Sequence, residues 1–324
     1  MCTIIAENAV TLSQRFISGH WLQPHIARYH VVSKPKANHP ILFQCRPIIN
    51  NMNIQEILAR KGAQKVTEIP HDVLALLNAG TIPTVNLTEW LAVDHSQLVK
   101  RVFPSMGIDA PMINQVVEEI NRQKKPSTMN VIKVVGSFLH EKYANTSQYT
   151  TLLQQLSMHL SDSVRCYACY FVASNPAIPL VDKLSMLKPL VADNHFGVRE
   201  VVWMALRPEM SDNLNISIPL MAQWAESDNP NIRRFSCEAL RPRGVWCMHI
   251  EALKETPEIY LPVLEKLRAD PSRYVQDSVG NWLNDASKSR PHFVAAVCER
   301  WEKESPTKET QYIIKKASRS IKGK

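Results

Sequence analysis

The stretch that decides the fold is Val198-Arg199-Glu200-Val201-Val202-Trp203-Met204-Ala205-Leu206-Arg207-Pro208, because the chain repeats its pattern. The next copy is Ile232-Arg233-Arg234-Phe235-Ser236-Cys237-Glu238-Ala239-Leu240-Arg241-Pro242. A further copy is Val275-Gln276-Asp277-Ser278-Val279-Gly280-Asn281-Trp282-Leu283-Asn284-Asp285. Apolar residues recur at the same offsets in these copies. Each copy therefore predicts a helix that packs one face on its neighbours.

A nearly constant spacing separates the copies, which open with Val164-Arg165, Val198-Arg199, Ile232-Arg233 and Val275-Gln276. Successive openings lie 34 (164 to 198), 34 (198 to 232) and 43 (232 to 275) residues apart. Apolar helical runs such as 184–191 and 261–267 precede the copies. A period in this range is typical of stacked helical pairs. We therefore predict an all-α fold, an α-solenoid of HEAT-like repeats with a concave face.

Aspartates recur just upstream of the openings, at Asp162, Asp193, Asp228 and Asp270. The arginines of the openings recur with them. This joint recurrence predicts a structural role, in which Arg165, Arg199 and Arg233 bond the aspartate-containing turns along the stack.

The composition restricts the function. The 324 residues carry a net charge of +8, and the pI of about 9.1 indicates an anionic partner, most often nucleic acid. The alternative is a basic surface that serves only solubility. The sequence has 9 glycines against 21 prolines and contains no phosphate-binding glycine loop, which argues against a nucleotide cofactor. No apolar run reaches the length of about 18 residues that a membrane span needs.

The seven cysteines suggest reduced thiols. Cys166 and Cys169 form a lone C-x-x-C inside a predicted helix, with no second pair at the spacing of a zinc finger. This placement favours buried apolar residues over a zinc site.

Three regions are expected along the chain. Residues 1–52 hold four prolines and one acidic residue, and we interpret them as an extension, either disordered or not native. An organelle transit segment is the other interpretation of residues 1–52. Residues 53–149 are predicted to form the N-terminal helical part of the solenoid. Residues 150–324 are predicted to hold the HEAT-like repeats that carry the active site.

The ends of the repeated helices differ, although repeats that served only as scaffold would be interchangeable. These ends are Arg207-Pro208, Arg241-Pro242-Arg243-Gly244-Val245-Trp246 and Asn284-Asp285. Because equivalent ends of adjacent repeats lie side by side, we expect them to cluster along one rim. Arginines there suit phosphates, and a tryptophan offers a stacking surface. The alternatives are arginines that satisfy helix carbonyls, a tryptophan that anchors packing, and an aspartate that bonds a neighbouring arginine.

Glu200 is a carboxylate inside a mostly apolar helix, one turn before Trp203 and on the same face. Such a group needs an ion-pair partner, solvent or a functional role. The alternative to function is a salt bridge to an arginine of the next repeat.

Longer runs of the sequence resemble the AlkC branch of the AlkC/AlkD DNA alkylation repair proteins, over roughly residues 53–321. The runs that carry the resemblance include Asp228-Asn229-Pro230-Asn231-Ile232-Arg233-Arg234, Arg241-Pro242-Arg243-Gly244-Val245-Trp246, Leu267-Arg268-Ala269-Asp270-Pro271-Ser272-Arg273-Tyr274-Val275-Gln276 and Asn86-Leu87-Thr88-Glu89-Trp90-Leu91-Ala92-Val93-Asp94.

The resemblance implies a DNA glycosylase that removes cationic alkylated purines such as 3-methyladenine from duplex DNA without flipping the base into a pocket. It implies no metal or organic cofactor, a monomer, the bacterial cytoplasm and a basic concave face that binds DNA. Carboxylates near the sugar would stabilise the positive charge of an oxocarbenium-like state and position water.

The resemblance also implies the residues of the site. Asp285 matches the family's aspartate and Trp246 its active-site tryptophan. The family glutamate five residues before the Arg-Pro proline is Trp203 here, so Glu200, one turn upstream, is our candidate for the other carboxylate. The expected catalytic residues are thus Asp285, Glu200 and Trp246. The expected DNA contacts are Arg241, Arg243, Arg207, Trp203 and Lys288.

Two other functions stay open. One is a non-catalytic member of the superfamily that binds bent or branched DNA by its shape. Carboxylates locked in salt bridges would favour this function. The other is a HEAT scaffold that binds proteins through an apolar groove.

Overall fold

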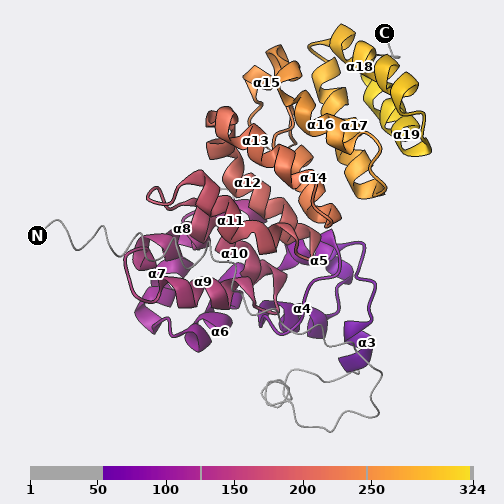
Figure 1. The fold of residues 1–324 in the computed structure, drawn as a ribbon. Coiled ribbons are helices and arrows are strands. Elements are labelled where there is room, and N and C mark those ends of the chain that lie inside the picture. The colour runs from indigo at the N-terminus through magenta and orange to yellow at the C-terminus, as the bar shows by residue number, and fades with distance from the viewer. Residues whose placement is uncertain (1–53, 125, 246, 322–324) are drawn as a thin grey trace, which may run out of the picture. The chain divides into compact units, whose positions relative to one another are not determined.

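The helices that carry the repeated pattern lie beside one another in the order of the sequence (Figure 1). They are α10 (Asp162–Ala173), α12 (Phe196–Asp212), α14 (Pro230–Glu238), α17 (Arg273–Ser287) and α19 (Lys308–Ala317). The computed structural model describes residues 54–124, 126–245 and 247–321. These residues belong to one compact unit, 51–324. The described residues contain helices and no strand, so the predicted all-α fold of helical repeats is confirmed.

Each of these helices packs against the helix that precedes it in the sequence. The preceding helices are α9 (Tyr149–Ser157), α11 (Leu180–Val191), α13 (Leu214–Trp224), α16 (Leu261–Leu267) and α18 (Pro291–Glu304). An earlier pair, α7 (Ala110–Asn121) and α8 (Thr128–Tyr143), packs on α10 in the same way. The stack therefore begins before residue 150, where the repeated pattern becomes visible in the sequence.

The remaining elements lie at the N-terminal end, connect the pairs or, in the case of η4, follow the last helix. They are α3 (Ile54–Leu58), η1 (Val66–Glu68), α4 (His71–Asn78), α5 (Leu87–Ala92), α6 (His95–Val102), η2 (Phe103–Met106), α15 (Glu251–Glu255), η3 (Pro257–Tyr260) and η4 (Ser318–Ser320). None of the described helices is long and apolar enough to span a membrane. The expected boundaries at 52 and 149 stay predictions, and residues 1–52 lie outside the described residues.

Two glycines permit the closest approaches in the stack. A Cβ atom on Gly136 of α8 would lie 2.7 Å from the carbonyl oxygen of Tyr167 in α10. A Cβ atom on Gly280 of α17 would lie 2.6 Å from the Cβ of Lys316 in α19. Any larger side chain at either position would push neighbouring repeats apart.

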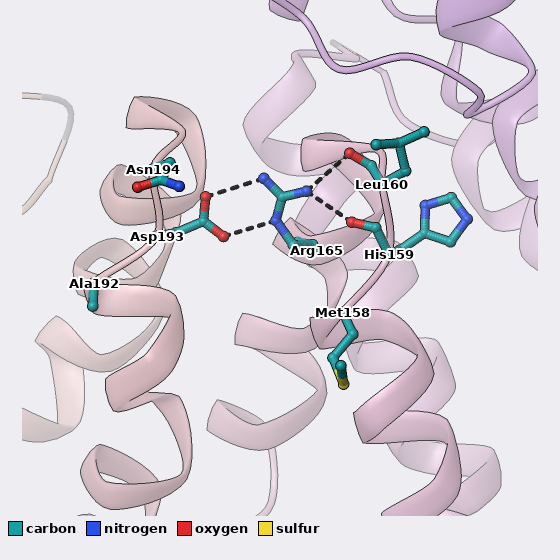
Figure 2. A pocket seen from close by; sticks show the side chains of 7 residues that line it. All are labelled: Met158, His159, Leu160, Arg165, Ala192, Asp193 and Asn194. Atoms are coloured by element: carbon teal, nitrogen blue, oxygen red, sulfur yellow. Dashed lines mark hydrogen bonds and ion pairs between the residues drawn. The ribbon is translucent and has the colours of Figure 1, made fainter. Parts of the chain in front are cut away.

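Arginine clamps tie successive repeats together, as the recurrence predicted. Nη1 of Arg165 donates to the carbonyl oxygens of His159 and Leu160 in its own turn, at 2.7 and 2.9 Å. Nε and Nη2 of Arg165 donate to the carboxylate of Asp193 in the next turn, at 2.7 and 3.0 Å (Figure 2). Arg233 makes the same set of bonds with its own turn and with Asp270. The planar guanidinium suits this fork geometry and so fixes the spacing of the turns.

Of the four aspartates, Asp193 and Asp270 hold equivalent positions in their turns, whereas Asp162 and Asp228 do not. The position six residues before each clamp residue is occupied by His159, Asp193, Ser227 and Asp270. In each of these turns, the side chain at that position accepts a bond from the amide two residues later. Asp162 instead accepts bonds from the amide and hydroxyl of Thr84, and Asp228 is exposed.

Several residues have the local roles that are typical of their residue types. Asn86 caps α5 by accepting a bond from the amide of Glu89, at 2.9 Å. Gly80 has the left-handed φ of 71° that ends α4. Cys166 and Cys169 are buried in α10. Arg207-Pro208, in contrast, does not end its helix, because α12 continues past Pro208 to Asp212.

His95 is a buried titratable group at the start of α6. Its Nδ1 lies 2.6 Å from the hydroxyl of Tyr167 in α10, and its Nε2 has no hydrogen-bond partner among the described residues. Burial lowers the pKa of His95 from 6.5 to about 4. As the pH falls, the unfolded chain therefore takes up a proton on His95 near pH 6.5, whereas the folded protein takes it up only near pH 4. The free energy of unfolding therefore decreases as the pH falls from 6.5 to 4.

Replacing His95 with Gln should make the fold less sensitive to acid. Between pH 7 and 4.5, the free energy of unfolding of the wild type should fall by about 2 to 3 kcal/mol more than that of His95→Gln. Urea unfolding at the two pH values measures both changes. An equal fall in the two proteins would contradict a neutral buried His95.

Candidate active site

Three carboxylates and three cations alternate in one connected chain across α12, α14 and α17. In order they are Glu200, Arg234, Glu238, Arg241, Asp285 and Lys288. We call this set the ion chain. It joins residues far apart in the sequence, because α14 packs against both α12 and α17.

Arg234 begins the link from α12 to α14. Its Nη1 lies 2.7 Å from Oε1 of Glu200, and its Nη2 lies 3.8 Å from Oε2 of Glu238. Oε2 of Glu200 also accepts a bond from the indole Nε1 of Trp203, at 2.8 Å, so these two side chains share a helix face as expected. The predicted alternative for Glu200, a salt bridge to an arginine of the next repeat, is thus observed.

Arg241 lies between two carboxylates. Its Nη1 donates to Oε1 of Glu238 at 2.8 Å, and its Nε and Nη2 lie 2.9 and 2.8 Å from Oδ2 of Asp285. Burial disfavours the charge of this guanidinium, but Glu238 and Asp285 outweigh burial and raise the pKa of Arg241 above its usual value. The predicted meeting of the Arg-Pro end with Asp285 is therefore observed. The space between the two carboxylates suits a cation.

Asp285 is almost fully buried, with 3% of its surface exposed. Its second oxygen, Oδ1, faces Lys288, whose Nζ lies at 3.3 Å and is close to solvent. Lys288 thus ends the ion chain at the surface. A cation there can move away more easily than a buried guanidinium.

Glu238 is a site residue that the sequence reasoning missed. It is buried near the end of α14, where Oε2 accepts a bond from the hydroxyl of Ser278 at 2.7 Å. Burial opposes its charge, but Arg234 and Arg241 prevail and hold the pKa of Glu238 below its usual value. The signal that could have found it is the one that found Glu200: a carboxylate within a helix whose neighbours are apolar.

Arg207 is held by backbone carbonyl groups inside the protein. It is 3% exposed, and its guanidinium donates to the carbonyl oxygens of Ala239, Arg241 and Met248, at 2.7, 2.7 and 3.1 Å. Burial lowers its pKa. In the free protein Arg207 thus holds the chain that follows α14, an arrangement that does not favour the predicted DNA contact. Trp203, at 4% exposed, is likewise interior.

The connection after α14 holds two other predicted residues. Arg243 is half-buried and donates from Nη2 to the hydroxyl of Ser289 at 2.7 Å, while its Nε has no partner among the described residues. Trp246 lies outside the described residues. On either side of Trp246, Val245 is 56% exposed and Met248 is 88% exposed.

Tyr274, which was not predicted as a site residue, contacts two arginines. The guanidinium carbons of Arg234 and Arg199 lie 4.4 and 5.2 Å from the centre of its ring. Nε of Arg199 also lies 3.3 Å from the Tyr274 hydroxyl. Two guanidinium groups against one aromatic ring concentrate positive charge beside the ion chain.

A pocket of about 420 Å³ lies elsewhere, between the turns that Arg165 clamps (Figure 2). Its lining includes Met158 and Asn194 but none of the predicted site residues. The ion chain is thus a packed array and not the wall of this pocket. Within residues 54–124, 126–245 and 247–321, no cluster of three or more potential metal ligands occurs.

Replacing Arg241 with Gln should leave Glu238 and Asp285 buried without their shared cation. At pH 7 we expect the free energy of unfolding to fall by about 3 to 5 kcal/mol. The loss should be smaller at pH 4 than at pH 7, because Arg241 helps to hold the pKa of Glu238 low, and without it the buried carboxyl takes up a proton more readily as the pH falls. Arg243→Gln is the matched control and should cost less than about 1 kcal/mol. Equal losses for Arg241→Gln at both pH values would contradict this electrostatic account.

Comparison with known proteins places the chain. A family model described as DNA alkylation repair enzyme matches residues 91–321. The uncharacterized protein YhaZ of Bacillus subtilis (strain 168) is 41% identical over 117 residues, which are 36% of this chain and 32% of YhaZ. The match thus spans about a third of the length of that curated relative.

Two solved structures are also similar. The Pseudomonas fluorescens alkylpurine DNA glycosylase AlkC, bound to DNA containing an abasic site analog, has a TM-score of 0.57 at 24% identity and covers 80% of this chain and 65% of that one. AlkD2 from Streptococcus mutans has a TM-score of 0.48 at 24% identity, with coverage of 64% and 98%. The likeness to AlkC shows a shared fold. The family model matches more than half of the residues of this chain, so the chain belongs to the DNA alkylation repair enzyme family.

Proposed function

We propose that the protein is a DNA glycosylase that hydrolyses the N-glycosidic bond of cationic alkylated purines, 3-methyladenine above all. The ion chain carries this proposal, because it gathers three carboxylates on adjacent helices of a DNA alkylation repair enzyme. The relative AlkC, whose fold this chain shares, is named an alkylpurine DNA glycosylase, and its structure holds DNA with an abasic site analog.

The chemistry needs few protein groups. A purine alkylated at N3 is already cationic, so it leaves without a general acid. The enzyme has to stabilise positive charge on the deoxyribose and to position a water molecule. Neither task requires the base to enter a pocket, which agrees with a packed array of charges. No metal or organic cofactor is part of the proposal.

Asp285 and Glu238 are the carboxylates that we assign to the sugar. In the free protein the guanidinium of Arg241 lies between them. When DNA binds, Arg241 turns to a flanking phosphate, which offers it an equally strong charge-assisted bond. The cationic sugar then takes the place of the guanidinium between the two carboxylates.

Glu200 and the surface residues complete the proposed site. Glu200 holds Arg234 and Trp203, so it orients the first cation of the ion chain and remains a catalytic candidate. Arg243 and Lys288 are the proposed phosphate contacts on either side. Trp246, outside the described residues, keeps its proposed role as an aromatic face beside the sugar. A monomer in the bacterial cytoplasm completes the proposal.

Asp285→Asn should strongly slow base release and spare DNA binding. The test is to incubate the purified protein with methylated duplex DNA and to quantify the bases released. Loss of one transition-state charge should lower the excision rate about 100- to 1000-fold. Glu238→Gln and Glu200→Gln, assayed beside it, show which carboxylate positions water.

Asp277→Asn is the matched control, because Asp277 lies on the same helix, bonded to Tyr312 and Lys316 away from the ion chain. It should release bases like the wild type. Release of 3-methyladenine by wild type no faster than by Asp285→Asn would overturn the proposed activity.

The pairing of the carboxylates favours a second candidate function. Glu200, Glu238 and Asp285 each have a cationic partner in the free protein. Carboxylates locked in this way also suit a non-catalytic protein that binds bent or branched DNA by shape. A wild type that binds such DNA tightly yet releases no base would favour this function over the glycosylase.

A further inference from the structure

One of the three clamp arginines has lost its carboxylate. Arg165 and Arg233 each bind an aspartate of the next repeat through Nε and Nη2. The repeat equivalent of these aspartates for Arg199 is Ser227. Its hydroxyl accepts a bond from the amide of Asn229, as the equivalent carboxylates do in their turns, so the position is the same and only the charge is missing.

Arg199 keeps half of the clamp. Its Nη1 donates to the carbonyl oxygens of Asp193 and Asn194, at 2.7 and 2.9 Å, as in the sister repeats. Its Nε has moved to the hydroxyl of Tyr274, at 3.3 Å. Its Nη2 makes no hydrogen bond with any residue that the structure describes. The edge of the guanidinium that grips a carboxylate in the sister repeats is therefore without an anion.

The surroundings of Arg199 add to its affinity for an anion. Arg234 lies over the same Tyr274 ring as Arg199 and brings a second positive charge close to it. The Tyr274 hydroxyl accepts a bond from Arg199, so its own hydrogen is free to donate to another oxygen. A fork of N–H donors beside a hydroxyl is well suited to a phosphate group.

We propose that Arg199 and Tyr274 bind a phosphate of the DNA backbone, which takes the place of the missing aspartate. This inference rests on the proposed function. Arg199 and Tyr274 lie close to the ion chain, because Arg234 contacts Tyr274 and also bonds Glu200 and Glu238. A phosphate on Arg199 would therefore lie close to Glu238, one of the two carboxylates that we assign to the sugar, and it would fix the register of the strand.

The decisive variant is Ser227→Asp, which rebuilds the clamp of the sister repeats. The new carboxylate should occupy Arg199, so the melting temperature should rise while DNA affinity falls on the order of tenfold. The slope of log Kobs against log salt should become shallower by about one unit. Fluorescence anisotropy with a short undamaged duplex measures the DNA affinity and its salt slope, and thermal unfolding measures the melting temperature. Ser227→Asn, of the same size without the charge, should leave the slope unchanged.

Arg199→Gln separates a bound phosphate from simple repulsion by the new aspartate. Alone, it should lower the salt slope by about one unit as well. In its background, Ser227→Asp should cost little further affinity, because the two changes act on one contact. An unchanged slope for Arg199→Gln, or an undiminished cost of Ser227→Asp in that background, would overturn the inference.

The same measurements separate this inference from the proposed function. If the wild type binds DNA and releases bases while the Arg199 and Ser227 variants behave like it, only the phosphate site is wrong. If the wild type shows no salt-dependent DNA binding, both are wrong.

Discussion

The arginine clamp is the interaction on which the rest of the structure depends. One guanidinium ties the carbonyls of its own turn to a carboxylate of the next turn, at Arg165 and again at Arg233. Because these turns begin the second helix of each pair, the clamps set the register of α10 with α12 and of α14 with α17. That register places residues more than thirty positions apart within hydrogen-bond distance, and the part of the ion chain that joins α14 to α17 is its consequence.

The ion chain carries a large desolvation cost, because its carboxylates Glu238 and Asp285 are buried. Each buried charge loses its hydration, and replacement of buried ion pairs by apolar groups often stabilises a protein. Here three acids and three bases share their charges across three helices, with Arg241 between Glu238 and Asp285. Such an array is stable only while every member is paired. It is therefore poised to exchange one cation for another, which is what a cationic sugar would require.

The sequence predicted the helical pairs and their stacking, because the apolar residues that pack them recur at the same offsets in each repeat. It also predicted that Asp285 would meet an Arg-Pro end. It misaligned the aspartates, because Asp228 stands one position past the turn residue Ser227, and only the hydrogen bonds to the turn show which residue is equivalent. Arg207 looked like a surface residue because Pro208 suggested a helix end, yet the helix continues and buries it. Glu238 was not singled out, although Arg234 and Arg241 lie within four residues of it; only its third partner, Ser278, comes from another helix.

The central claim is that Arg241 holds the place of a cationic sugar between Glu238 and Asp285. The most direct measurement is a crystal structure of this chain bound to duplex DNA with an abasic site analog. The account predicts that Arg241 has left Asp285 for a backbone phosphate, and that both carboxylates face C1′ of the abasic sugar. A complex in which Arg241 still bonds Asp285 while the abasic sugar lies elsewhere would contradict it.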